Sequence, residues 1–203
     1  MAVITISRQF GAGGKTVGKK IAQKLGYTFI DEDIVQLIAE KAKVSPGWVE
    51  SVEKEAGGRL SRIVSRMVSK PLVDKVLKDE YGYIDEQIYI DYLVVLIAQM
   101  AEEGNVVFLD RGSQYILNDH PDAFHILLIN TFANRVKFMM EHYDLTEQRA
   151  TQVVKGEEKR RINLYKKIGK QDYDQAQLYH MVINMAKVDL EDAVTTIVNM
   201  VAH

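Results

Sequence analysis

The segment that most constrains the fold is a glycine-rich stretch shortly after the first apolar run of the chain. The run covers Val3–Ser7, and the stretch reads Gly11-Ala12-Gly13-Gly14-Lys15-Thr16. Its glycines can adopt positive φ angles, which lets successive N–H groups turn toward one anion. A helix that begins at Lys15 would add the positive end of its dipole at the same place. The order of strand, anion-binding loop and helix therefore predicts an α/β fold.

The stretch matches the second half of the phosphate-loop pattern G-x-x-x-x-G-K-[ST]. Gln9 stands where the pattern has its first glycine, so the match is incomplete. In this interpretation the Lys15 ammonium bridges the β- and γ-phosphates of a nucleotide, and the Thr16 hydroxyl binds Mg²⁺. The alternative is an ordinary glycine-rich turn between a strand and a helix. The predicted nucleotide contacts are Gly11, Ala12, Gly13, Gly14, Lys15, Thr16 and Val17.

Five short apolar runs lack a clean alternation of apolar and polar residues, which is typical of strands buried on both faces of a parallel sheet. The runs are Val3–Ser7, Tyr27–Ile30, Asn105–Leu109, Phe124–Ile129 and Met181–Asn184. Apolar residues recur at helical spacing in Lys15–Leu25, Glu86–Glu103, Asn134–His142 and Leu190–Val201. This alternation predicts a parallel sheet with right-handed crossovers. His125 lies in one predicted strand, so we expect a core histidine there.

The chain of 203 residues fits one domain, 1–203, because domains average roughly 150 residues. The second and third predicted strands are too far apart for a single crossover helix. We interpret 33–86 as an inserted helical region that binds the acceptor, with helices at Ile34–Lys41, Pro46–Glu55 and Arg59–Lys78. A second stretch, 145–179, is highly charged. We expect it to bury little surface and to open as a mobile lid, and a solvated helix pair is the alternative.

Acidic residues end two of the predicted strands, at the edge where open α/β sheets bind their ligands. Asp110 closes the third strand, where a carboxylate can hold a water of Mg²⁺. Arg111 beside it can grip a second phosphate, and a plain strand-ending turn is the alternative. Asp31 closes the second strand. It can bind a substrate hydroxyl or, like Asp33, cap the helix that follows.

Arginines after the fourth predicted strand are candidates for stabilising charge in phosphoryl transfer. A phosphoryl group in transfer spreads negative charge over its equatorial oxygens, which arginines can stabilise. Arg135 and Arg161 are the favoured pair, and with Lys15 they form the predicted catalytic set. Arg160 is a further predicted nucleotide contact. Closure of the lid 145–179 would exclude water and so suppress hydrolysis of ATP.

Composition narrows the range of functions. Hydrophobic residues make up 47% of the chain, enough for a core, and the net charge of -2 gives no global reason for a nucleic-acid or acidic-membrane partner. The chain has no cysteine, which excludes disulfides, thiolate zinc sites and a cysteine nucleophile. The sequence shows no targeting segment and no apolar stretch near the roughly 20 residues that span a bilayer. We expect a cytoplasmic protein, either a monomer or a homodimer.

The sequence resembles the cytidylate kinase-like family of P-loop nucleoside monophosphate kinases over nearly its whole length. The resemblance rests on Ser7-Arg8-Gln9-Phe10-Gly11, Val106–Ser113, Arg135-Val136-Lys137, Tyr165 and Tyr179–Asn184. It implies a three-layer P-loop NTPase fold with a five-stranded parallel sheet in the order 2-3-1-4-5, a helical region that binds a nucleoside monophosphate, and a short lid. It also implies ATP and Mg²⁺ as cofactors and CMP or dCMP as the acceptor.

The resemblance further assigns roles to four residues by motif position. Arg111 and Arg135 correspond to phosphate or acceptor contacts, and Glu158 and Arg161 correspond to lid residues. Together with the strand-end carboxylate, the predicted substrate contacts are Asp31, Arg111, Arg135 and Glu158.

The leading hypothesis is a phosphotransferase that moves a phosphoryl group from ATP to a nucleoside monophosphate, mainly through positioning and charge stabilisation. A second hypothesis is a kinase of a small-molecule hydroxyl, which needs a carboxylate base such as Asp31 near the acceptor oxygen. A third is a nucleotide-binding regulator with little transfer activity, suggested by Gln9 in the loop. An assay of ADP release across different acceptors separates the three.

Overall fold

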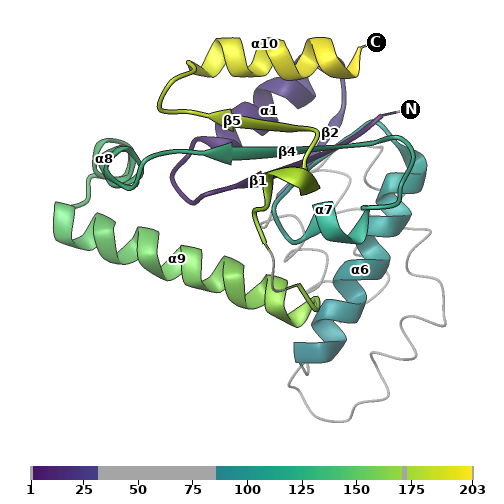
Figure 1. The fold of residues 1–203 in the computed structure, drawn as a ribbon, viewed down its shortest axis with the longest axis horizontal. Helices are drawn as coiled ribbons and strands as arrows, with labels where there is room; N and C mark the ends of the chain where they lie inside the picture. The colour runs from purple at the N-terminus through teal and green to yellow at the C-terminus, as the bar shows by residue number, and fades with distance from the viewer. Residues whose placement is uncertain (1, 32–85, 171–172, 203) are drawn as a thin grey trace, which may run out of the picture.

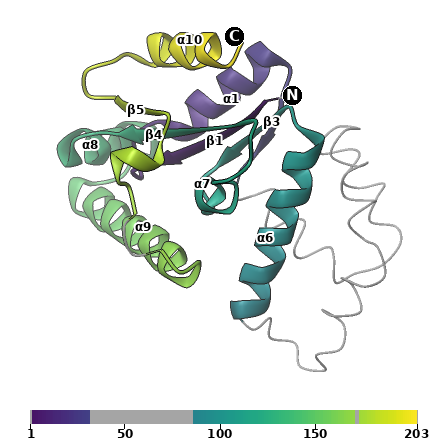
Figure 2. The ribbon, with the colours of Figure 1, turned by 45° about the vertical axis from the view of Figure 1, so that its right-hand side comes forward.

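The computed structural model describes residues 2–31, 86–170 and 173–202. Figures 1 and 2 show strands that alternate with helices along the chain. The predicted helices Ile34–Lys41, Pro46–Glu55 and Arg59–Lys78 lie outside the described residues, as does nearly all of region 33–86. The elements are β1 (Val3–Arg8), α1 (Gly14–Leu25), β2 (Thr28–Ile30), α6 (Glu86–Glu103), β3 (Val106–Leu109), α7 (Ser113–Ile116), β4 (Ala123–Ile129), α8 (Phe132–Tyr143), α9 (Glu147–Lys167), the 3₁₀ helix η1 (Ala176–Leu178), β5 (Met181–Asn184) and α10 (Leu190–Val201).

The five strands form one parallel sheet in the order β2-β3-β1-β4-β5, which confirms the predicted fold class and strand order. β1 lies in the middle, with Val3 opposite Val106 of β3 and Ala123 of β4. Because all neighbouring strands are parallel, their carboxyl ends meet at one edge of the sheet. The segments that follow β1, β2 and β3 therefore leave the sheet at the edge where α/β folds bind ligands.

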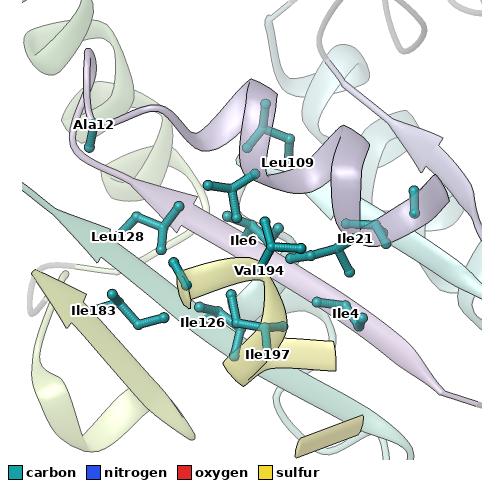
Figure 3. Close-up of a cluster of buried hydrophobic side chains, with 14 residues drawn as sticks. Ile4, Ile6, Ala12, Ile21, Leu109, Ile126, Leu128, Ile183, Val194 and Ile197 are labelled. Atoms are coloured by element: carbon teal, nitrogen blue, oxygen red, sulfur yellow. The ribbon is translucent and has the colours of Figure 1, made fainter. Parts of the chain in front are cut away.

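Helices cover both faces of the sheet and make the fold three-layered. α1 and α10 lie on one face, and α6 and α7 lie on the other (Figures 1 and 2). On the first face, Ile4 and Ile6 of β1 join Val194 and Ile197 of α10 in a buried cluster (Figure 3). Val3 packs instead with side chains of α6 on the opposite face. Since successive residues of β1 enter two different cores, the strand is apolar without alternation.

The predicted element boundaries agree closely with the structure. Glu86–Glu103, Met181–Asn184 and Leu190–Val201 coincide with α6, β5 and α10, and the other strands and helices predicted within the described residues differ by one or two residues at their ends. The short helix α7 was not predicted. α8, α9 and α10 each follow an N-cap residue whose side chain accepts an N–H of the first turn, namely Thr131, Thr146 and Asp189. Among the described helices, none is long and apolar enough to cross a membrane.

The charged stretch 145–179 differs from the expectation. It contains one helix of 21 residues, α9, followed by η1, rather than a pair of solvated helices. Tyr165 is fully buried, as are Ala150 and Val154 on the same helix. The Tyr165 ring meets the Tyr115 ring of α7 edge-on, with 5.0 Å between centroids. The few buried apolar residues of α9 therefore share one side of the helix, while most described residues of the stretch are exposed or half-buried, and its role as a lid stays a prediction.

His125 is a core residue, as predicted. It is buried in β4, and its Nδ1 lies 2.7 Å from Oγ1 of Thr5 on β1. Its ring lies beside that of His180, with centroids 5.3 Å apart. Burial lowers the pKa of His125 to about 4, and the neighbouring charges of His180 and His120 act in the same direction. The imidazole is therefore neutral in the folded protein near neutral pH.

This lowered pKa predicts that the folded state loses stability as the pH falls from 6.5 to about 4. In that window the unfolded chain binds a proton at His125 and the folded protein does not, so unfolding becomes easier by up to about 1.4 kcal/mol per pH unit. His125→Gln cannot take up this proton, so its free energy of unfolding should depend less on pH. Urea unfolding of both proteins across the window measures the difference, and equal pH slopes would contradict the assignment.

Candidate active site

The glycine-rich loop forms a tight turn between β1 and α1. Gly11 and Gly13 have φ angles of +88° and +83°, a region that residues with side chains rarely adopt. A Cβ on Gly11 would lie 3.0 Å from Cβ and from O of Arg135, and a Cβ on Gly14 would lie 2.4 Å from Cδ of Arg8. A Cβ on Gly13 would meet no described atom within 4 Å. The loop is thus packed against its neighbours at two glycines and open at Gly13.

Gln9 takes the place of the first pattern glycine without opening the turn. Its N–H donates to Leu128 O, and its Oε1 accepts the N–H of Asn130 at 3.0 Å. The N–H of Ala12 donates to Gln9 O at 2.9 Å and closes the turn. The Gln9 side chain is therefore engaged with the end of β4, and these bonds hold the loop where a glycine is usual.

The first turn of α1 completes the loop. Its N-cap is Gly13, which has no side chain to fill the space beyond the helix end. Thr16 is exposed in this turn, as a Mg²⁺ ligand must be. The N–H of Val17 donates to Gly13 O and its side chain is buried in the core, so its predicted nucleotide contact stays a prediction. A phosphate therefore fits the glycines, the helix end and the hydroxyl of Thr16.

Mg²⁺ would be held here mainly by phosphate oxygens and water. Within 2–31, 86–170 and 173–202, no three His, Cys, Asp or Glu side chains are arranged to hold a metal ion by themselves. Mg²⁺ commonly uses one or two protein ligands and completes its octahedron with water and substrate phosphates. The exposed hydroxyl of Thr16 is consistent with that pattern.

Lys15 and Asp31 connect the loop with the end of β2. Lys15 Nζ lies 2.9 Å from Oδ2 of Asp31. The Asp31 side chain is only 7% exposed, whereas that of Lys15 is 44% exposed. A buried carboxylate thus lies next to the ammonium group that is predicted to bind phosphates. Sequence reasoning placed both residues at the site, and the structure adds that they form an ion pair.

The turn after β3 has an unusual backbone conformation. Asp110, Arg111 and Gly112 have successive φ angles of +59°, +60° and +71°. For residues with side chains this region costs roughly 1–3 kcal/mol each, and it occurs often at functional sites. Oδ1 of Asp110 accepts the N–H of Arg8 at 3.1 Å, and Oδ2 accepts its Nε at 2.9 Å. Each oxygen accepts one bond from Arg8 and keeps a second lone pair, so the predicted role of Asp110 in holding a water of Mg²⁺ is compatible with this pairing.

These side chains line one cavity of about 200 Å³ at the carboxyl edge of the sheet. The strands provide one wall, and α9 provides the other through Glu157, Arg160, Arg161 and Leu164. The cavity is lined by five basic and three acidic side chains, a surplus of positive charge that favours a polyphosphate. The predicted site residues that the structure brings together here are Lys15, Asp31, Asp110, Arg111, Arg160 and Arg161.

Arg135 is buried at the start of α8, beside the loop. Its Nη1 donates to Oε2 of Glu158 at 3.1 Å and to Phe10 O at 3.4 Å. Its Nε is buried and has no hydrogen-bond partner among the described residues. A buried N–H without an acceptor is costly, so a nearby anion that accepts from it would be stabilising. Arg135 lies beside the loop but lines a second pocket between α8 and α9 rather than the cavity at the strand ends, so its predicted catalytic role stays a prediction.

Arg161 makes contacts that the sequence did not predict. Its guanidinium bonds to Glu158, to Asp174 and to the hydroxyl of Tyr165. Burial by itself would lower the pKa of Arg161, but the hydrogen bond and charge of Asp174, with Glu158, raise it above its ordinary value. Tyr165 follows Arg161 at i+4 on one helix, a spacing from which the contact could have been inferred. Asp174 lies in a turn beyond α9, and no spacing rule identifies it.

Comparison with known proteins agrees with this geometry. The sequence matches the cytidylate kinase-like family over residues 3–187, which include the loop, the turn after β3 and all of α9. The chain belongs to this family. Membership places it among phosphotransferases of the P-loop kinase type, which bind a nucleotide at a glycine-rich loop.

Individual relatives add detail to the family match. A shikimate kinase from Actinobacillus succinogenes is 39% identical over 62 residues, which are 30% of this chain and about a third (34%) of that enzyme. The crystal structure of an uncharacterized protein from Eubacterium ventriosum has a TM-score of 0.71 and 22% identity, over 99% of this chain and 98% of that one. Shikimate kinase from Acinetobacter baumannii in complex with shikimate has a TM-score of 0.51 and 15% identity, over 100% of this chain and 93% of that one. Both structures show that the fold is shared.

The packing of the loop predicts that Gly11→Ala weakens nucleotide binding by roughly tenfold or more. The added methyl group must tolerate a positive φ angle and must displace the backbone of Arg135. Gly156→Ala is the control, because this α9 glycine has open space around it among the described atoms. The control should keep its nucleotide affinity and gain up to about 1 kcal/mol of stability from helix propensity. Titration with a fluorescent nucleotide and thermal unfolding measure both, and unchanged affinity in Gly11→Ala contradicts the loop assignment.

Proposed function

We propose that the protein transfers the γ-phosphoryl group of ATP to a hydroxyl group of a small polar molecule. The observation that carries the proposal is the buried carboxylate of Asp31, 2.9 Å from Lys15 Nζ. A hydroxyl must lose its proton as its oxygen attacks phosphorus, and a carboxylate within hydrogen-bond reach can accept that proton. An acceptor phosphate is already ionised near neutral pH and needs no such base.

The named relatives support this class of acceptor. The relative from Actinobacillus succinogenes is a shikimate kinase, and the structure from Acinetobacter baumannii holds shikimate. Shikimate is a carboxylic acid that carries hydroxyl groups. In this chain Arg111 and Asp31 line the same cavity, so a hydroxy acid could place its carboxylate at the guanidinium and its hydroxyl at Asp31. We therefore infer that the acceptor is an anionic molecule with a reactive hydroxyl.

The reaction follows from the contacts of the loop. Lys15 exchanges Asp31 for the β- and γ-phosphates, which leaves the Asp31 carboxylate to accept a hydrogen bond from the acceptor hydroxyl. As the acceptor oxygen bonds to the γ-phosphorus, the bond to the bridging oxygen of ADP breaks and the hydroxyl proton passes to Asp31. Lys15 and the arginines that line the cavity stabilise the charge that develops. Bound Mg²⁺ supplies further positive charge to the phosphates.

A nucleoside monophosphate is the second candidate acceptor. The family description favours it, and so does the surplus of basic side chains in the cavity, where Arg111 and Arg160 could hold an acceptor phosphate. The two candidates differ in their need for Asp31. Only a hydroxyl acceptor requires the carboxylate as a base.

A coupled assay of ADP release separates the two candidates. The acceptors are shikimate and other small hydroxy acids on one side, and CMP, dCMP, UMP and AMP on the other. We expect turnover with a hydroxy acid well above the rate of ATP hydrolysis without acceptor. Preferred turnover of CMP or dCMP would establish the second candidate instead.

Replacement of Asp31 tests the proposed base directly. Asp31→Asn should lower kcat by roughly 10²- to 10⁴-fold with a hydroxyl acceptor, because the amide cannot accept the proton. The affinity for ATP should not fall, because the Asp31 carboxylate then no longer competes with the phosphates for Lys15. Lys19→Met, which alters an exposed lysine of α1, serves as the control and should keep normal kcat. Normal kcat in Asp31→Asn would remove the main argument for a hydroxyl acceptor.

A further inference from the structure

The guanidinium of Arg161 has no N–H group left for a substrate. An arginine side chain has five N–H donors. Nε donates to Oε1 of Glu158 at 3.1 Å, and Nη2 donates to Glu158 and to Asp174. Nη1 donates to Oδ1 of Asp174 at 2.8 Å and to the Tyr165 hydroxyl at 3.4 Å. These five bonds to the protein's own side chains account for every donor that a phosphate would need.

Arg135, which lies beside the phosphate loop, provides the contrast. Both arginines are largely buried and both contact Glu158. The Nε–H of Arg135 has no acceptor among the described residues, whereas each N–H of Arg161 has one. The Nε–H of Arg135 is therefore not engaged by a described acceptor, and that of Arg161 is engaged by Glu158. Binding to Arg161 would first have to break a bond to a carboxylate or to Tyr165.

Glu158 links Arg161 to the phosphate loop. Its Oε1 takes the two bonds from Arg161. Its Oε2 accepts Nη1 of Arg135 at 3.1 Å and the N–H of Phe10 at 3.4 Å. A continuous series of ion pairs and hydrogen bonds thus runs from Asp174 through Arg161 and Glu158 to the loop. Fork-to-fork bonds between arginine and carboxylate fix orientation as well as distance.

We propose that Arg161 is a positioning residue: Asp174 holds its guanidinium, and the guanidinium orients Glu158, which sets the loop at Phe10 and the side chain of Arg135. This role replaces the direct catalytic contact that the sequence predicted for Arg161. The inference rests on the proposed function only in that the loop binds a nucleotide, and it does not depend on the acceptor.

The electrostatics of the cluster support this arrangement. Glu158 and Asp174 balance the charges of Arg135 and Arg161, so the cluster is neutral as a whole. Removing one partner of a buried pair leaves the other charge without compensation, which is costly. The hydroxyl of Tyr165, whose pKa is raised by burial, stays protonated and accepts from Arg161 as a neutral group. The cluster is therefore stable without a ligand and can hold its geometry before one binds.

The test measures binding of mant-ADP with Mg²⁺, a fluorescent nucleotide that needs no acceptor. Arg161→Met, Asp174→Asn and Glu158→Gln should each weaken binding by roughly tenfold, because each interrupts the series that sets the loop. The control is Arg149→Met, which alters an exposed arginine of α9 bonded to Gln152. The control should bind mant-ADP like the parent. Thermal unfolding of each variant shows whether it is folded. If Arg161→Met does not fold, Asp174→Asn serves as the test variant, because Asn has the same shape as Asp.

A double variant separates positioning from direct contact. If Arg161 acts through its neighbours, Arg161→Met combined with Asp174→Asn should bind mant-ADP within about twofold of Arg161→Met alone. Each variant should also lower kcat/KM for ATP, and the size of this loss should be the same whichever acceptor is used in the assay. These two results together support the positioning role.

Other outcomes overturn the proposal. Unchanged mant-ADP affinity in Arg161→Met, with kcat lowered by roughly a hundredfold, would identify Arg161 as a donor to the transition state. Additive losses in the double variant would contradict the series of contacts. A parent protein that binds mant-ADP but phosphorylates no hydroxyl acceptor contradicts the proposed function alone. A parent protein that does not bind mant-ADP contradicts both.

Discussion

The parallel pairing of β1 with β3 on one side and β4 on the other is the constraint on which the site depends. It brings the segments that follow three strands to the same edge of the sheet. The pairing continues beyond the strands, because Arg8 bonds to Asp110 after β3 and Gln9 bonds to Asn130 after β4. The glycine-rich loop is thus held between its neighbours on both sides, and this explains how it keeps its turn without the first glycine of the pattern.

Charge balance is the second general feature of the site. Lys15 is paired with Asp31, Arg8 with Asp110, and Arg161 with two carboxylates. Buried or half-buried cations that lie this close together need such partners, since unpaired charges in a low-dielectric site are unfavourable. A phosphate that binds Lys15 takes the place of a carboxylate. The proposed chemistry uses this exchange, because the carboxylate released by Lys15 is the one that we propose as the base for the acceptor hydroxyl.

Much of the fold could be predicted because its signals are local. Strands buried on two faces show as short apolar runs, and helices show as apolar residues at a spacing of three and four, so most boundaries were correct to within two residues. The burial of Tyr165 and Val154 on one side of α9 could not be inferred from the charged composition of 145–179, and the role of this stretch as a lid stays a prediction. Region 33–86 lies almost entirely outside the described residues, so its predicted helices stay predictions.

The sequence by itself determined the loop, the strand-end carboxylates and the basic character of α9, since each depends on neighbouring residues or on helical spacing. Only the tertiary structure decided which charges meet. Lys15 with Asp31, Arg8 with Asp110, and Arg161 with Asp174 join different segments, and no spacing rule connects them. The physical reason is that hydrogen bonds and ion pairs form between groups that the sheet brings within about 3 Å, whatever their separation along the chain. Hence an arginine that the sequence marks as a donor to phosphate has its donors already engaged by the protein.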